Sequence, residues 1–165
     1  MALLIAFMSL LATAAASVSD CSSGSSLFKL TSMSFSPDPT VIGQNSTLLL
    51  SMTVPEEING GTATYATTYN FIPFSPTVDP LCNTIVCPVR TGTLDTKSSY
   101  PIPDTLTGSL GIKITWTDDT GRELLCVNIR TTIGNAAKQL VLRKNKSHNA
   151  MRTHTAKARN STRFS

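Results

Sequence analysis

The chain has 165 residues, of which 41% are hydrophobic and 15% charged, and its formal net charge is +4 at pH 7. The charge is divided unevenly. Residues 17–133 carry six basic and ten acidic side chains, whereas residues 134–165 carry eight basic side chains and no acidic one. The net positive charge therefore describes neither part, and it gives no ground for a nucleic-acid-binding function.

An apolar run from Leu3 to Leu11 opens the chain and is too short to span a bilayer. The small residues that a signal peptidase requires follow it, at Ala14 to Ala16. We therefore predict a secretory signal peptide over residues 1–16. The alternative, a buried core helix, is disfavoured by the Gly- and Ser-rich sequence at 22–26. The remaining length suits one domain, predicted at 17–133, with a basic tail at 134–165.

The domain reads as a series of short strands broken by Pro- and Gly-rich turns, without a helical period. In the strand expected at 47–54, Leu48, Leu50 and Met52 alternate with polar or outward-facing residues. Further strands are expected at 27–35, 62–71, 108–117 and 122–131, with weaker candidates between 85 and 100. Such a pattern predicts a β-sandwich of about seven antiparallel strands.

The strand at 108–117 shows this alternation most clearly. Leu110, Ile112, Ile114 and Trp116 alternate with smaller or polar residues. The turn residues 118–121 follow, and we expect them to pair this strand with one that carries Cys126.

Four cysteines lie in the domain, and an even number in an exported chain implies two disulfides. Three pairings are possible. We favour Cys82–Cys87, which closes a tight loop, and Cys21–Cys126, which ties the first segment to the last strand. A zinc site needs closer cysteine pairs or added histidines, and both histidines fall in the tail, so no metal site is expected.

Asn45-Ser46-Thr47 is a candidate glycosylation site at the start of a strand, and the tail has two further matches, at Asn145 and Asn160. For the tail itself three interpretations stay open. It is solvated and disordered, it is attracted to anionic lipid headgroups, or it is a wrongly predicted end of the gene.

Enzymatic machinery is poorly represented. The sequence has no Gly-x-Ser-x-Gly motif, no histidine before residue 148 and no cysteine left over once two disulfides form. The acidic pairs Glu56-Glu57 and Asp118-Asp119 both fall at predicted turns, where solvated charge is the ordinary interpretation. We therefore expect a binding protein, not an enzyme, and no cofactor.

An ordered set of motifs resembles the ML (lipid-recognition) domain family over roughly residues 20–133. The set comprises an early Cys21, Pro73-Phe74, the short loop from Cys82 to Cys87 followed by proline, the strand ending in Trp116, and a final Cys126. This family includes Niemann-Pick type C sterol carriers and phosphatidylglycerol/phosphatidylinositol transfer proteins. The resemblance implies an immunoglobulin-like β-sandwich with an apolar cavity between its sheets.

The resemblance also suggests lipid-binding residues. Phe74 matches a phenylalanine at the cavity mouth of the sterol carriers, and Leu48, Leu110 and Trp116 match positions that face the cavity. Leu50 and Ile112 lie on the same strand faces and are expected to pack or line the interior. Tyr65, Tyr69 and Phe71 alternate on one face of their strand, where they either cap the cavity or pack between the sheets. Thr107 stands where the sterol carriers have another mouth aromatic, and the proline-rich residues 36–44 are closer to the phospholipid-transfer branch.

Together these features predict a monomeric lipid-binding and transfer protein that holds a sterol or a phospholipid and contacts donor and acceptor membranes transiently. Its expected location is outside the cell or in the lumen of an endosome, lysosome or vacuole, and nucleic acid is not an expected partner. The competing hypothesis is an immunoglobulin-like adhesion or recognition module with a filled core.

Overall fold

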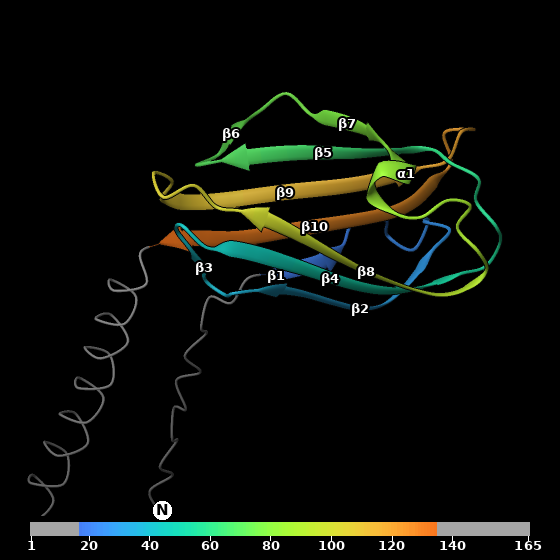
Figure 1. Ribbon diagram of the computed structural model, residues 1–165. Coiled ribbons are helices and arrows are strands. Elements are labelled where there is room, and N and C mark those ends of the chain that lie inside the picture. The colour runs from blue at the N-terminus through green and yellow to red at the C-terminus, as the bar shows by residue number, and fades with distance from the viewer. Residues whose placement is uncertain (1–16, 135–165) are drawn as a thin grey trace, which may run out of the picture.

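The computed structural model describes residues 17–134, which form an all-β fold with one helical turn. The predicted signal peptide and the tail sequons at Asn145 and Asn160 lie outside the described residues. Two sheets pack face to face as a sandwich, which confirms the predicted fold class (Figure 1).

The larger sheet has the strand order β1-β10-β9-β5-β6, with β3 added to β10 and β7 added to β5. Its strands are β1 (Ser17–Asp20), β3 (Thr40–Val41), β5 (Thr62–Tyr69), β6 (Ile72–Pro73), β7 (Thr77–Pro80), β9 (Gly108–Thr117) and β10 (Glu123–Gly134). The smaller sheet has the order β2-β4-β8, formed by β2 (Lys29–Ser36), β4 (Asn45–Val54) and β8 (Gly92–Pro101). The helical turn is α1 (Leu81–Thr84).

The long strands follow the expected alternation of side chains. Every second residue of β4, from Ser46 to Val54, is buried, and β9 pairs with both β5 and β10 along its length. The turn at 118–121 joins β9 to β10, as expected, with a bulge between Glu123 and Leu125. The structure exceeds the predicted seven strands because β1, β3, β6 and β7 have only two to four residues, too few to show a period.

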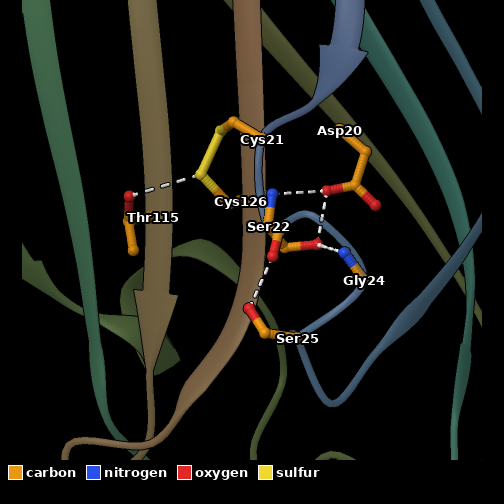
Figure 2. Close-up of a disulfide and its surroundings, with 7 residues drawn as sticks. All are labelled: Asp20, Cys21, Ser22, Gly24, Ser25, Thr115 and Cys126. Atoms are coloured by element: carbon orange, nitrogen blue, oxygen red, sulfur yellow. Dashed lines mark hydrogen bonds between the residues drawn. A yellow bond between two sulfur atoms is a disulfide. The ribbon is translucent and has the colours of Figure 1, made fainter.

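On one side of the sandwich, near β1 and β2, backbone hydrogen bonds join the segment before β2 to the larger sheet, beside a disulfide within that sheet. The Cys21–Cys126 disulfide joins the end of β1 to β10 (Figure 2). The Cys21 amide also donates a hydrogen bond to the Cys126 carbonyl at 3.0 Å. Just before β2, the amides of Leu27 and Phe28 donate to carbonyls of β10. This side of the smaller sheet is therefore fixed against the larger sheet.

A short loop beside the disulfide is held by a single carboxylate. Asp20 accepts hydrogen bonds from the hydroxyl of Ser22 at 2.6 Å and from its amide at 2.7 Å (Figure 2). These bonds lower the pKa of Asp20, because they favour the charged form.

The second disulfide, Cys82–Cys87, closes a loop of five residues' separation around α1. Both disulfides have the pairing favoured from the sequence. The short helix was not expected, and it buries Leu81 completely against the core. No helix within residues 17–134 is long and apolar enough to cross a membrane.

Candidate functional site

The space between the sheets is lined by inward-facing side chains of the central strands. Leu48 and Leu50 on β4 are 2% and 4% exposed, and Trp116 on β9 is 2% exposed. Leu125, Val127 and Ile129 on β10 are fully buried and belong to the same apolar cluster. Three of the predicted site residues therefore lie inside the sandwich.

The opposite side of the sandwich, between β5 and β8, is less completely covered. Apart from buried Ala63, the inward-facing side chains of both strands are half-buried, in contrast to the buried row on β4. These side chains are partly exposed although apolar residues pack beside them. We call this side the open edge, and its residues are Tyr65, Thr67 and Tyr69 of β5 with Leu94, Thr96, Ser98 and Tyr100 of β8.

Two phenols lie near each other at the open edge, one from each sheet. Burial raises the pKa of Tyr100, and the nearby Tyr65 adds to the rise. The Tyr65 hydroxyl forms a hydrogen bond of 3.1 Å with Oγ1 of Thr84 in α1. Both rings pack on the main apolar cluster together with Leu94 and Ile112. The open edge is therefore bordered by aromatic rings on an apolar base.

At one end of the open edge, Tyr69 ties β5 to the loop that precedes β9. Its hydroxyl donates to the Thr107 carbonyl at 2.7 Å and accepts from the Thr107 amide at 3.1 Å. Tyr69 is paired with Leu110, which is 9% exposed and belongs to a second, smaller apolar cluster with Ile102. Thr107, which stands where the sterol carriers have an aromatic residue at the cavity mouth, is thus held through its backbone.

Phe74 lies beside this edge and is 55% exposed. Its amide donates to the Thr67 carbonyl at 2.9 Å, which extends the pairing of β6 with β5 by one residue. Because directly paired residues lie on the same face of a sheet, Phe74 belongs to the inward-facing side with Thr67. Half-buried Ile112, paired with Thr67, contacts both apolar clusters.

The expected alternation of Tyr65, Tyr69 and Phe71 was wrong at its last member. β5 ends at Tyr69, and Asn70 and Phe71 form a turn in which both residues have positive φ, 46° and 69°. The turn places Phe71 on the outer face of the larger sheet, where it is 88% exposed. The sequence shows a strand pattern through this turn because both of its flanks are aromatic or apolar.

The interior also contains polar groups. Oγ1 of Thr40 and of Thr131 form a hydrogen bond of 3.0 Å with each other inside the protein. The buried hydroxyl of Ser46 and the indole N–H of Trp116 have no hydrogen-bond partner among the described residues. An apolar interior with a few polar groups is the usual composition of a small-molecule binding site.

Two hollows in the surface of residues 17–134 lie outside the space between the sheets. The larger, of about 510 Å³, lies over the outer face of β5, β9 and β10, and we call it the outer groove. The smaller, of about 170 Å³, lies between residues 57–60 and the turn at 118–122. This smaller hollow contains members of both acidic pairs considered from the sequence.

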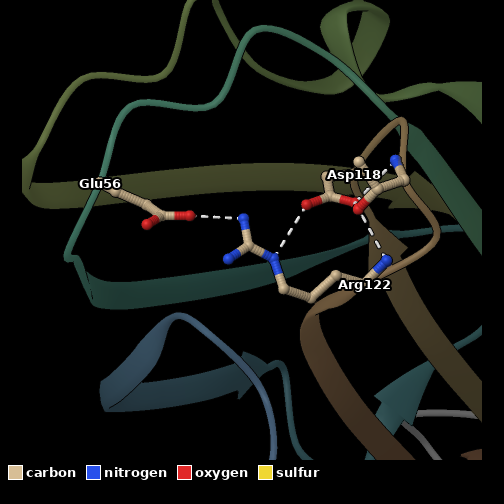
Figure 3. A network of polar contacts seen from close by, with 4 residues as sticks. Glu56, Asp118 and Arg122 are labelled. Carbon is tan, nitrogen blue, oxygen red and sulfur yellow. Dashed lines mark hydrogen bonds and ion pairs between the residues drawn. The ribbon is translucent and has the colours of Figure 1, made fainter.

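The carboxylate of Asp118 has a structural role in that turn. It accepts hydrogen bonds from the amide and hydroxyl of Thr120 and from the amide and Nε of Arg122, whose guanidinium also pairs with Glu56 (Figure 3). These bonds, that of the Thr120 hydroxyl foremost, lower the pKa of Asp118 to about 2. A carboxylate held ionised by four donors organises a turn and is a poor base. Within residues 17–134 no cluster of acidic, histidine or cysteine side chains has the geometry of a metal site.

The sequence indicated only a weak strand candidate between 85 and 100, and the inward-facing residues of β8 were not among the predicted site residues. Leu94, Thr96, Ser98 and Tyr100 alternate with exposed residues such as Asp95 and Lys97, which is a period of two. The alternation of apolar and polar residues that marks a strand was weak here, because two of the four inward-facing residues are small and polar. The charged, outward-facing members of the alternation support the strand prediction more strongly than the inward-facing ones do.

Comparison with known proteins agrees with this architecture. The family model described as ML domain matches residues 15–133. Among curated proteins, "Putative phosphatidylglycerol/phosphatidylinositol transfer protein 3" of Dictyostelium discoideum is 29% identical over 119 residues, which covers 70% of this chain and 79% of that protein. "Putative phosphatidylglycerol/phosphatidylinositol transfer protein 1" of the same organism is 26% identical and covers 69% and 78%.

Among solved structures, a Niemann-Pick type C2 protein from the Japanese carpenter ant superposes with a TM-score of 0.57 at 16% sequence identity. The match covers 72% of this chain and 99% of the ant protein. At this identity the likeness concerns the fold.

Proposed function

Since the chain belongs to the ML domain family, whose members bind lipids, we propose that it carries one lipid molecule between its two sheets and transfers it between membranes. The observation that carries this proposal is the contrast between the two sides of the sandwich. The side near Cys21–Cys126 is closed, whereas the inward-facing residues of β5 and β8 are half-buried. A lipid chain entering there would meet an apolar interior without crossing a strand.

The proposed binding residues are those that face the interior or border the open edge. Leu48, Leu50, Leu110, Ile112 and Trp116 would contact apolar chains, and Tyr69 and Phe74 would contact the ligand where it emerges. To the set from the sequence we add Tyr65 and Tyr100, whose rings border the open edge. The unpartnered donors of Ser46 and Trp116 would serve polar groups of the ligand.

A phospholipid and a sterol both suit an apolar interior. The names of the two relatives, which refer to phosphatidylglycerol and phosphatidylinositol, favour a phospholipid. Burial of roughly 300 Å² of apolar ligand surface at about 25 cal/mol per Å² gives roughly 7 to 8 kcal/mol before the costs of association. Affinity in this range permits release to an acceptor membrane. The lipid would leave chemically unchanged.

We place the protein in the secretory pathway, either secreted or in the lumen of an endosome, lysosome or vacuole. Two disulfides within the described residues support an oxidising compartment. Asn45, the proposed glycosylation site, is exposed at the first residue of β4, so a glycan there would extend into solvent. The protein would act as a monomer and contact donor and acceptor membranes transiently.

The experiment that tests this function is recovery of the cargo. The full chain would be produced in the secretory pathway of a eukaryotic host and extracted with organic solvent, and the extract analysed by mass spectrometry. We expect a phospholipid or a sterol at up to one molecule per protein, and protein-dependent transfer of that lipid between liposomes. A protein that neither copurifies with lipid nor exchanges it would instead support the competing hypothesis of an adhesion module with a filled core.

A further inference from the structure

The outer groove lies on the face of the larger sheet that is turned away from the interior. Successive side chains of a strand point to opposite faces, so its lining residues alternate with the inward-facing rows of the same strands. Lys113 lies between inward-facing Ile112 and Ile114, and Arg130 lies between Ile129 and Thr131. A ligand in this groove would therefore occupy a place separate from a lipid between the sheets.

The strand register explains why this face is hollow. Gly111 on β9 is paired with Thr68 on β5 and with Arg130 on β10. A Cβ added to Gly111 would lie 3.7 Å from the Thr68 Cβ, in ordinary contact, so the sheet lacks a side chain where one would fit. The missing side chain leaves a floor of backbone between the residues that form the walls.

Two cations border this floor without a counter-charge. Lys113 is paired with Asn128, so Arg130, two residues further along β10, is its diagonal neighbour at roughly 7 to 8 Å. Neither forms an ion pair within residues 17–134. All ten acidic side chains of the chain lie between positions 20 and 123, so the segments before and after these positions contain no carboxylate side chain that could pair with Lys113 or Arg130. Two uncompensated cations at this spacing favour a bound anion of the size of a phosphate group.

The apolar wall of the groove is Phe71, at a position where the fold alone would favour glycine. Tyr69 pairs with Ile72, so Asn70 and Phe71 form a two-residue hairpin turn with positive φ at both residues. Such turns prefer Asn-Gly, because the left-handed conformation is strained for a bulky side chain. The Phe71 ring is 88% exposed, so packing does not offset the strain. A strained, exposed aromatic residue is typical of a functional position.

The turn is nevertheless firmly held. The Asn70 amide donates to the Ser109 carbonyl at 2.9 Å, and the Asn70 Oδ1 accepts from the Ser109 amide at 2.9 Å. Gly108 is required here, because a Cβ at that residue would lie 2.1 Å from the Asn70 Oδ1. Phe71 is thus presented from a fixed backbone beside the two cations.

We propose that the outer groove docks the protein on membranes by binding the phosphate groups of anionic phospholipids between Lys113 and Arg130, while the Phe71 ring enters the interfacial layer. Charge complementarity selects the anionic lipid, and the exposed ring of Phe71 selects a membrane over a phosphate in solution. Cations near an anionic surface and an aromatic ring at the headgroup level both stabilise such docking. The inference does not depend on the lipid carried between the sheets.

The experiment measures binding of the full chain to vesicles of phosphatidylcholine alone and of phosphatidylcholine with phosphatidylglycerol, by flotation. The test variants are Lys113→Gln with Arg130→Gln, and Phe71→Gly. The matched control is Arg90→Gln with Lys97→Gln, which removes the same charge from exposed residues elsewhere. The basic tail is identical in every protein, so it contributes equally to each measurement.

We expect the double variant of the groove to bind anionic vesicles about 30-fold more weakly, because each basic residue near a charged surface contributes ~1 kcal/mol. The control variant should lose far less. Phe71→Gly should bind vesicles about tenfold more weakly while it unfolds at the same or a higher temperature, since glycine relieves the turn. Equal losses in the groove and control variants would overturn the proposal, and so would unchanged binding by Phe71→Gly.

A second experiment, with a soluble phosphate ester, distinguishes binding to a membrane from binding to a free phosphate. Glycerol 3-phosphate would be titrated into the isotopically labelled full chain, with the amide signals of Gly111, Lys113 and Arg130 monitored by NMR. We expect these signals to shift only weakly, at concentrations far above those of lipid phosphate that saturate vesicle binding. Tight binding of the soluble ester that is unaffected by Phe71→Gly would contradict a membrane site. Lipid recovery in the earlier extraction experiment is independent of either result.

Discussion

The hydroxyl of Tyr69 forms hydrogen bonds with both backbone groups of Thr107, as donor to the carbonyl at 2.7 Å and as acceptor from the amide at 3.1 Å. Through these two bonds the end of β5 is joined to the loop between β8 and β9. That loop borders the open edge, where the side chains of both sheets are half-buried. The phenol of Tyr69 thus helps to hold one end of the proposed entrance.

Replacing Tyr69 with phenylalanine keeps the ring and removes both bonds. We expect a loss of about 1 kcal/mol of stability, the usual net contribution of such hydrogen bonds, and lipid exchange between liposomes that is several-fold faster. The control is Tyr65→Phe, which removes one bond to Thr84 from the same face of β5. Hydrogen exchange at Thr107 should rise only in Tyr69→Phe. If Tyr69→Phe changed neither the rate of lipid exchange between liposomes nor hydrogen exchange at the Thr107 amide, other contacts would hold this end.

Substitutions of Phe74 and Trp116 should affect different properties, lipid binding for Phe74 and stability for Trp116. Phe74 is 55% exposed beside the open edge, whereas Trp116 is 2% exposed in the main cluster. Phe74→Ala should weaken lipid binding with little effect on the unfolding midpoint, and Trp116→Ala should cost roughly 3 to 5 kcal/mol of stability. Urea unfolding and a fluorescent-lipid titration on both variants make the comparison. If both variants lose binding and stability to the same degree, the entrance has been placed at the wrong residue.

The two disulfides should contribute unequally, because they close loops of very different length. In the chain-entropy model, Cys21–Cys126 with a separation of 105 residues is worth roughly 4 to 5 kcal/mol, and Cys82–Cys87 with a separation of 5 roughly 2. Paired Cys→Ala variants in urea unfolding should show this order. A larger loss for the short loop would mean that α1, with buried Leu81, depends on its disulfide for more than chain entropy.

The sequence predicted the parts of the fold that repeat a simple period or join distant residues covalently. The alternation in β4 and β9 and the turn at Asp118 were sufficient to define the central strands. The sequence failed at Phe71, because a two-residue turn with positive φ is normally marked by glycine. It also missed the open edge on β8, since Thr96 and Ser98 are small polar residues that face inward without being fully buried.

The candidate site was harder to predict for a related reason. Exposure of an inward-facing residue depends on how far the two sheets are apart, and no local pattern encodes that separation. Tyr65 and Tyr100 approach each other from different sheets, and their proximity follows only from the packing. The outer groove depends on the register that brings Gly111 beside Arg130, which a one-residue shift would remove.

The final prediction concerns acid stability. The pKa of Asp118 is lowered to about 2 from its ordinary 3.8, mainly by the hydrogen bond from the Thr120 hydroxyl. The folded protein therefore binds fewer protons at this group than the unfolded chain does, and the resulting stabilisation is complete above about pH 4 and lost as the pH falls toward 2. Asp118→Asn should melt at a lower temperature than the wild type at pH 6, and the difference should shrink toward zero near pH 2.

Asp119→Asn is the matched control for this measurement, because it makes the same change one residue away, on a side chain that takes no part in the network with Arg122 (Figure 3). Its melting temperature should run parallel to that of the wild type across the same pH range. The lowered pKa of Asp20 contributes equally to all three proteins, so it cancels in the comparison. A constant difference between Asp118→Asn and the wild type from pH 6 to pH 2 would mean that the turn is held by contacts other than the ionised carboxylate.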